Sequence, residues 1–123
     1  MKIPRPPYHS VTNELLYALL TGGDCIGYED LSIYSTYAMG LSYPVKAVYA
    51  VIVVEADPST SDKSKVIRFR EFDLENLRPT AFSGIPLGDL AMYQVKGEHN
   101  LAHFQAIGIE ENKVHTLRIQ YFG

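Results

Sequence analysis

The chain has 123 residues, 46% of them hydrophobic and 20% charged, and its 11 basic and 14 acidic side chains give a formal net charge of -3. This composition predicts one domain, spanning residues 1–123, around a single hydrophobic core. No apolar run approaches the roughly 20 residues that a membrane-spanning helix needs, so no membrane partner is expected. Mild acidity also makes nucleic acid an unexpected partner, because phosphate binding depends on clustered Lys and Arg.

The first residues of the chain bear on its location. Residues 1–7 carry positive charge without an apolar segment, which differs from a secretory signal and predicts a cytoplasmic protein. Cys25 is the one cysteine, so no intrachain disulfide can form. Nothing near Cys25 in the sequence would activate its thiol, and we interpret it as a structural cysteine.

The N-terminal third predicts helix, strand and helix. Residues 14–20 place leucines at helical spacing after a capping residue at position 12 or 13, and two glycines at 22–23 end the helix. Residues 31–34 predict a short strand. Ser35 or Thr36 can then cap a short helix over residues 37–41.

The middle of the chain predicts strands. Residues 47–55 form a continuous β-branched apolar run, typical of a central strand that is buried on both faces. Residues 57–64 are small and polar and predict an exposed loop between two strands. Residues 66–72 alternate in polarity, which predicts a strand with one wet face. Residues 90–95 predict a strand, although residues 88–92 could instead begin a helix.

The C-terminal third predicts a β-hairpin with strands at 104–109 and 114–121. Leu117, Ile119 and Tyr121 alternate with polar residues, so they are expected to face the core. The predicted class is therefore α+β: one or two N-terminal helices packed on a mainly antiparallel sheet, with a C-terminal hairpin.

Three histidines raise the question of a metal site. His99 and His103 are four residues apart, so on a helix both rings would lie on one face, with Glu98 and Glu110 as further ligand candidates. The pattern lacks the flanking acid of the metalloprotease motif, and unrelated surface histidines are the commoner explanation. No metal is therefore expected, although a small hydrolase or isomerase using His99, His103 and His115 stays open as a third hypothesis.

The N-terminal half resembles the His-Tyr-Glu branch of the ADP-ribosyltransferase superfamily. The resemblance rests on residues 7–12 (Pro-Tyr-His-Ser-Val-Thr), a helix ending at 19–23, residues 31–36 (Leu-Ser-Ile-Tyr-Ser-Thr) and the strand at 48–55. It implies that His9 binds the adenosine ribose of NAD and that Tyr34 stacks on the nicotinamide. Ser35 and Thr36 follow Tyr34 and are assigned to the same NAD site.

The second half departs from this family. The resemblance implies a glutamate that stabilises an oxocarbenium-like transition state, but the matching segment at 92–98 holds Met92 or Gln94 where that acid is expected. Gln94 and the nearest downstream acid, Glu98, are the catalytic candidates. A glutamine can hydrogen-bond a ribose hydroxyl but cannot offset developing positive charge.

Two main hypotheses follow for function. The first is an NAD- or nucleotide-binding domain that transfers ADP-ribose to a protein or a small molecule. The second is a non-catalytic module that binds a protein, or a second copy of itself, through exposed tyrosines and a sheet edge, because the nine tyrosines combine apolar rings with polar tips.

Overall fold

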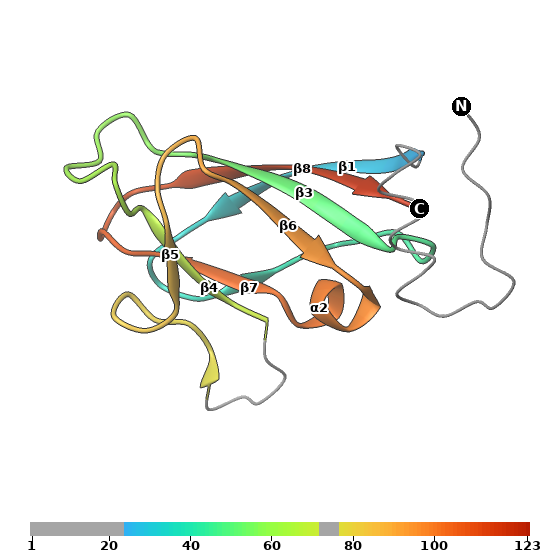
Figure 1. Cartoon of the computed structure of the whole chain (residues 1–123). Coiled ribbons are helices and arrows are strands. Elements are labelled where there is room, and N and C mark those ends of the chain that lie inside the picture. Colours follow the sequence, from blue (N-terminus) through green and yellow to red (C-terminus); the bar gives the residue numbers. More distant parts are fainter. Residues whose placement is uncertain (1–23, 72–76) are drawn as a thin grey trace, which may run out of the picture.

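The computed structural model describes residues 24–71 and 77–123, which form two four-stranded antiparallel sheets (Figure 1). Sheet A has the strand order β1-β8-β3-β6 and sheet B the order β2-β7-β4-β5. The strands of sheet A are β1 (Cys25–Ile33), β8 (His115–Phe122), β3 (Tyr49–Glu55) and β6 (Met92–Lys96); those of sheet B are β2 (Met39–Gly40), β7 (Gln105–Gly108), β4 (Ile67–Arg70) and β5 (Ile85–Leu87); helix α2 (Glu98–His103) connects β6 to β7.

The strands pair in a nested order. β1 pairs with β8, β2 with β7, β3 with β6 and β4 with β5, as in one long antiparallel hairpin. This hairpin is rolled up so that successive pairs lie in alternate sheets, and the β3–β8 and β4–β7 pairings complete the two sheets. Eight strands arranged in this way form a jelly roll.

The core lies between the two sheets and is built by period-2 alternation. In β8 the inward residues Leu117, Ile119 and Tyr121 are buried, as the sequence predicts, while the residues between them face outward. Ile52 of β3 and Phe69 of β4 are also buried, from sheets A and B respectively. Each such side chain stabilises the fold by about 1.5–3 kcal/mol through the burial of apolar surface.

The predicted α+β class is wrong. Of the described residues, 46% lie in strands and 7% are helical, and none of their helices reaches seven residues. The helix predicted over 14–20 lies outside the described residues. The helix predicted over 37–41 is replaced by β2, because five residues are too few for a stable isolated helix and the backbone of Met39 and Gly40 pairs with β7 instead.

The predicted C-terminal hairpin is also wrong, although both of its strands exist. β7 belongs to sheet B and β8 to sheet A, so the connection between them crosses from one layer of the sandwich to the other. Both strands bury side chains in the same core. Two strands that face each other across a core carry the same alternating pattern as two that pair side by side, so the pattern alone does not separate them.

The strand predicted at 47–55 is confirmed as β3, and it is interior to its sheet, between β8 and β6. Its predicted burial on both faces is wrong, because Val51 and Val53 on the outer side are only half-buried. The strands expected at 66–72 and 90–95 are confirmed as β4 and β6, and residues 57–64 form the loop between β3 and β4.

None of the described helices is long and apolar enough to cross a bilayer.

His115 anchors the β3–β4 loop from inside the sandwich. Its ring is fully buried, and its Nδ1 accepts a hydrogen bond from the backbone N–H of Asp57 at 3.0 Å. The ring is therefore neutral, with its proton on Nε2, an atom without a hydrogen-bond partner among the described residues. Burial lowers the pKa of His115 below its usual 6.5, although Asp57, Glu110 and Asp89 oppose this shift.

The burial of His115 predicts a loss of stability in mild acid. The unfolded chain takes up the proton near pH 6.5 and the folded chain only at lower pH, so stability is complete above pH 6.5 and falls as the pH drops through the folded pKa. The slope is at most about 1.4 kcal/mol per pH unit. Urea unfolding between pH 7.5 and 5 measures it. His115→Asn keeps an acceptor near Nδ1 without a titrating ring and is expected to show a shallower slope; equal slopes would contradict this account.

Candidate functional site

The side of sheet A that points away from sheet B carries rows of exposed and half-buried side chains from all four strands. Strand alternation fixes its members, and register places them in rows across the four strands. We call this surface the Tyr28 face: Tyr28, Asp30 and Ser32 of β1; Thr116, Arg118 and Gln120 of β8; Val51, Val53 and Glu55 of β3; and Met92, Gln94 and Lys96 of β6.

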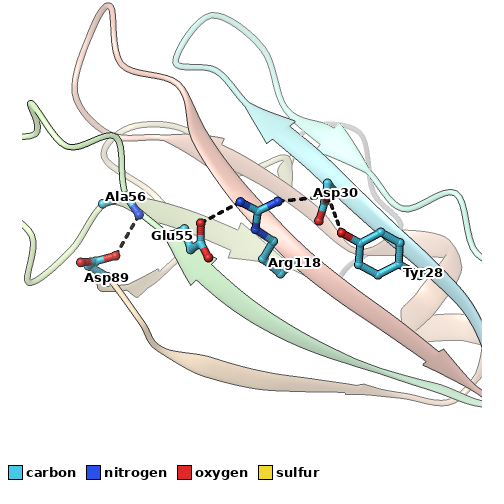
Figure 2. Close-up of polar contacts among 6 residues, drawn as sticks. All are labelled: Tyr28, Asp30, Glu55, Ala56, Asp89 and Arg118. Atoms are coloured by element: carbon cyan, nitrogen blue, oxygen red, sulfur yellow. Dashed lines mark hydrogen bonds and ion pairs between the residues drawn. The ribbon is translucent and has the colours of Figure 1, made fainter.

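Arg118 lies at the centre of the Tyr28 face and joins three strands (Figure 2). Its Nη1 is 3.0 Å from Oδ2 of Asp30 on β1, and its Nη2 is 3.0 Å from Oε2 of Glu55 on β3. The hydroxyl of Tyr28 donates a hydrogen bond to the same Asp30 oxygen. Two neighbouring strands thus hold the guanidinium between two carboxylates, and Asp30 in turn orients the Tyr28 ring.

The charges within this network stabilise one another. Hydrogen bonding from Tyr28, and then from Arg118, lowers the pKa of Asp30 below its usual value. The hydrogen bond to the Asp30 carboxylate raises the pKa of Tyr28, and the two carboxylates raise the pKa of Arg118. At neutral pH Asp30 and Arg118 are therefore charged, the Tyr28 hydroxyl keeps its proton, and the guanidinium lies between two carboxylates. Arg118 is therefore poorly suited to hold a phosphate.

Apolar side chains of β3 and β6 lie beside this network, among the polar residues of the Tyr28 face. The ring of Tyr28 is 66% exposed and Met92 is 67% exposed, and the half-buried Val53 lies between β8 and β6 in the row of Arg118 and Met92. Residues of these kinds, aromatic, Met and Arg, are enriched in protein–protein interfaces.

A strained residue borders the same face. Leu90 has a φ of 64°, in the left-handed region that a leucine rarely adopts, and its side chain is 72% exposed. Two hydrogen bonds hold the chain there: the Leu90 N–H donates to the Val54 carbonyl at 2.7 Å, and the Asp89 carboxylate accepts from the Ala56 N–H at 2.9 Å (Figure 2). Strained backbone positions cluster at functional sites in proteins, which makes Leu90 a candidate for the border of a binding surface.

A cavity of about 590 Å³ lies beside β6, lined by Glu71, Met92, Tyr93, Gln94, Lys96 and Asn100. The Tyr93 hydroxyl donates a hydrogen bond to Glu71 at 2.9 Å. Burial raises the pKa of the Glu71 carboxyl. Burial, and then the hydrogen bond to Glu71, raise the pKa of the Tyr93 hydroxyl to about 12. Glu71 is not among the residues that the sequence singled out, although it continues the inward alternation of Ile67 and Phe69, where a charged residue is unusual.

The residues assigned to NAD transfer do not meet among the described residues. Gln94 lines the cavity beside β6, and Glu98 begins α2 just beyond it. Gln94 lies in the same cross-strand row of sheet A as Tyr28. Tyr34 lies about 20 Å from Tyr28 along the direction of β1. Ser35 and Thr36 follow Tyr34, so the two groups are at opposite ends of the sandwich. His9 lies outside the described residues.

The three histidines are also separated. His99 and His103 lie on α2 with ring centroids 4.4 Å apart. His115 begins β8, at the end of sheet A where β1 finishes, whereas α2 follows the last residue of β6, which lies at the opposite end. The described part of the chain contains no group of three or more His, Cys, Asp or Glu residues that could hold a metal ion.

Comparisons of this chain with protein-family models, with curated proteins and with solved structures gave no significant match. The candidate site therefore rests on the geometry alone.

The Tyr28 network predicts a specific titration. Because Tyr28 makes the largest contribution to the low pKa of Asp30, Tyr28→Phe is expected to raise that pKa toward the usual value for aspartate. A carboxyl-carbon NMR titration measures it. Tyr37→Phe, another exposed tyrosine, serves as the control and is expected to leave Asp30 unchanged. An Asp30 that titrates identically in the wild type and in Tyr28→Phe would show that the network does not form in solution.

Proposed function

We propose that this chain is a non-catalytic protein-interaction module that binds its partner through the Tyr28 face. The observation that carries the proposal is the Arg118 network, which orients the exposed Tyr28 ring on the outer face of edge strand β1. Side chains that are already ordered lose less conformational entropy when a partner binds. The network thus favours binding without a large rearrangement of the module.

The chemistry of the Tyr28 face favours a protein partner. Tyr and Arg are the residue types that most often dominate binding energy, and they do so where surrounding residues exclude water. Met92 and Val53 supply such apolar surroundings next to Arg118. Asp30 and Glu55 balance the charges of Arg118 and Lys96, so the face attracts neither polyanions nor polycations strongly.

NAD binding and ADP-ribose transfer stay predictions from the sequence. Their support is the short resemblance in the N-terminal half, whereas the described residues assigned to them lie at opposite ends of the sandwich. The cytoplasmic location is likewise a proposal, and the exposed thiol of Cys25 is suited to a reducing compartment.

Site-specific photocrosslinking tests the proposal. A photoreactive phenylalanine analogue at Met92 lies on the Tyr28 face without removing any member of the Arg118 network. The same analogue at Val45, which is 94% exposed outside the face, is the matched control. In cells of the natural source, we expect a discrete protein adduct from position 92 that Tyr28→Ala weakens by roughly tenfold or more. Equal adducts at both positions, or none at position 92, would contradict the proposal.

A thermal-shift measurement separates this function from NAD binding. A ligand at 100 times its dissociation constant adds about 2.7 kcal/mol to stability, which raises the unfolding midpoint by several degrees. We expect no shift with NAD or ADP-ribose. A shift with NAD that Tyr34→Ala abolishes would favour the transferase hypothesis over the interaction module.

A further inference from the structure

A second surface, separate from the Tyr28 face, is built around one exposed phenylalanine. Phe82 lies at the apex of a β-turn between Thr80 and Ser83, and its side chain is 93% exposed. The Thr80 N–H donates to the Ser83 carbonyl at 2.8 Å, and the Ser83 N–H donates to the Thr80 carbonyl at 3.2 Å. The Phe82 N–H donates to Oγ1 of Thr80 at 3.2 Å, so side chain and backbone both close the turn.

Two arginines of β4 hold this turn in place. The Arg68 guanidinium donates to the carbonyls of Ala81 at 3.1 Å and Gly84 at 3.0 Å, on either side of Phe82. Arg70 donates to the hydroxyl of Ser83. Gly84 has a φ of 128°, and a Cβ there would lie 3.1 Å from Cβ of Arg68, so a glycine is needed for this approach.

The result is a preorganised apolar knob with positive charge behind it. Among the described residues, the hydrogen bonds of Arg68 and Arg70 go to carbonyl and hydroxyl oxygens, which carry no full negative charge. Because the backbone of the turn is already ordered, insertion of Phe82 into a pocket costs only the rotamer entropy of its side chain. A partner for this knob therefore needs an apolar hollow bordered by negative charge.

The chain carries such a hollow on its own surface. A cavity of about 280 Å³ is lined by Ile109, by Ser61 and by three charged residues, Asp62, Glu110 and Lys65, so negative charge exceeds positive charge by one in its wall. Its walls are fixed, because the Glu110 carboxylate accepts hydrogen bonds from the N–H of Ser61 at 3.0 Å and from its hydroxyl at 2.6 Å. Hydrogen bonds from Ser64 lower the pKa of Asp62, and those from Ser61 lower the pKa of Glu110, so both carboxylates are ionised at neutral pH.

We propose that this chain assembles head to tail, with Phe82 of one copy inserted into the cavity beside Ile109 of a second copy. The contact places Arg68 and Arg70 of the first copy toward Asp62 and Glu110 of the second, so charge complementarity favours this occupant of the cavity. Knob and hollow are different surfaces of the same chain, which makes the contact heterologous; it produces rings or filaments, not an isologous dimer. The proposal is independent of the Tyr28 face.

Disulfide trapping between two differently labelled copies tests the contact. In a Cys25→Ser background, Ala81→Cys places a thiol beside the intact knob, and Lys65→Cys places one in the wall of the cavity. When the two purified variants are mixed under mild oxidation, we expect the 81–65 heterodimer to exceed either homodimer by about tenfold or more. Circular dichroism of each variant establishes that it is folded.

Two controls complete this test. Phe82→Ser, added to the Ala81→Cys copy, removes the knob and is expected to abolish the heterodimer. Val45→Cys, an exposed position elsewhere, replaces Lys65→Cys and is expected to give no excess of heterodimer. A heterodimer yield that Phe82→Ser leaves unchanged, a predominant 81–81 homodimer, or no crosslink in the mixture would each overturn the proposal.

Discussion

The structure depends on the insertion of the last strand, β8, between β1 and β3. Its buried side chains, Leu117, Ile119 and Tyr121, meet partners from both neighbours, so sheet A does not exist until the C-terminal residues are in place. All four nested pairings join one of the first four strands to one of the last four. The fold is therefore held together by contacts distant in sequence, whose loop-closure entropy must be offset by core burial.

The same strand that closes the core also builds the candidate site. Because alternate residues of β8 point to opposite faces, the burial of Leu117 and Ile119 fixes Arg118 on the outside, between Asp30 of β1 and Glu55 of β3. A shift of the register by one residue would bring Arg118 into the core and expose its apolar neighbours. The geometry of the Tyr28 face is thus a consequence of core packing, and the ion pairs orient side chains that the core has already placed.

The sequence predicted the alternation within strands better than the connections between them. The inward residues of β8 and the central place of β3 follow from local pattern and are confirmed. The Arg118 network could not be predicted, because Asp30 and Glu55 come from strands 88 and 63 residues away in sequence, and register across a sheet is not a local property. For the same reason, the pattern that predicted a C-terminal hairpin did not reveal that β7 and β8 lie in different layers. The cavity beside β6 shows the same limit. The exposure of Gln94 on β6 is consistent with strand alternation, but its neighbour in the cavity, Glu71, follows the last residue of β4 and is distant in sequence.

The central claim is that sheet A has one face in the core and one face open to a partner, and thiol labelling tests it most directly. In a Cys25→Ser background, Gln120→Cys and Ile119→Cys place a thiol on opposite faces of β8. We expect the thiol at 120 to react in the native protein at nearly the rate of an unfolded control, and the thiol at 119 to react only through unfolding, slower by several orders of magnitude. Equal protection at both positions, or equal reactivity, would contradict the two-layer structure and the Tyr28 face with it.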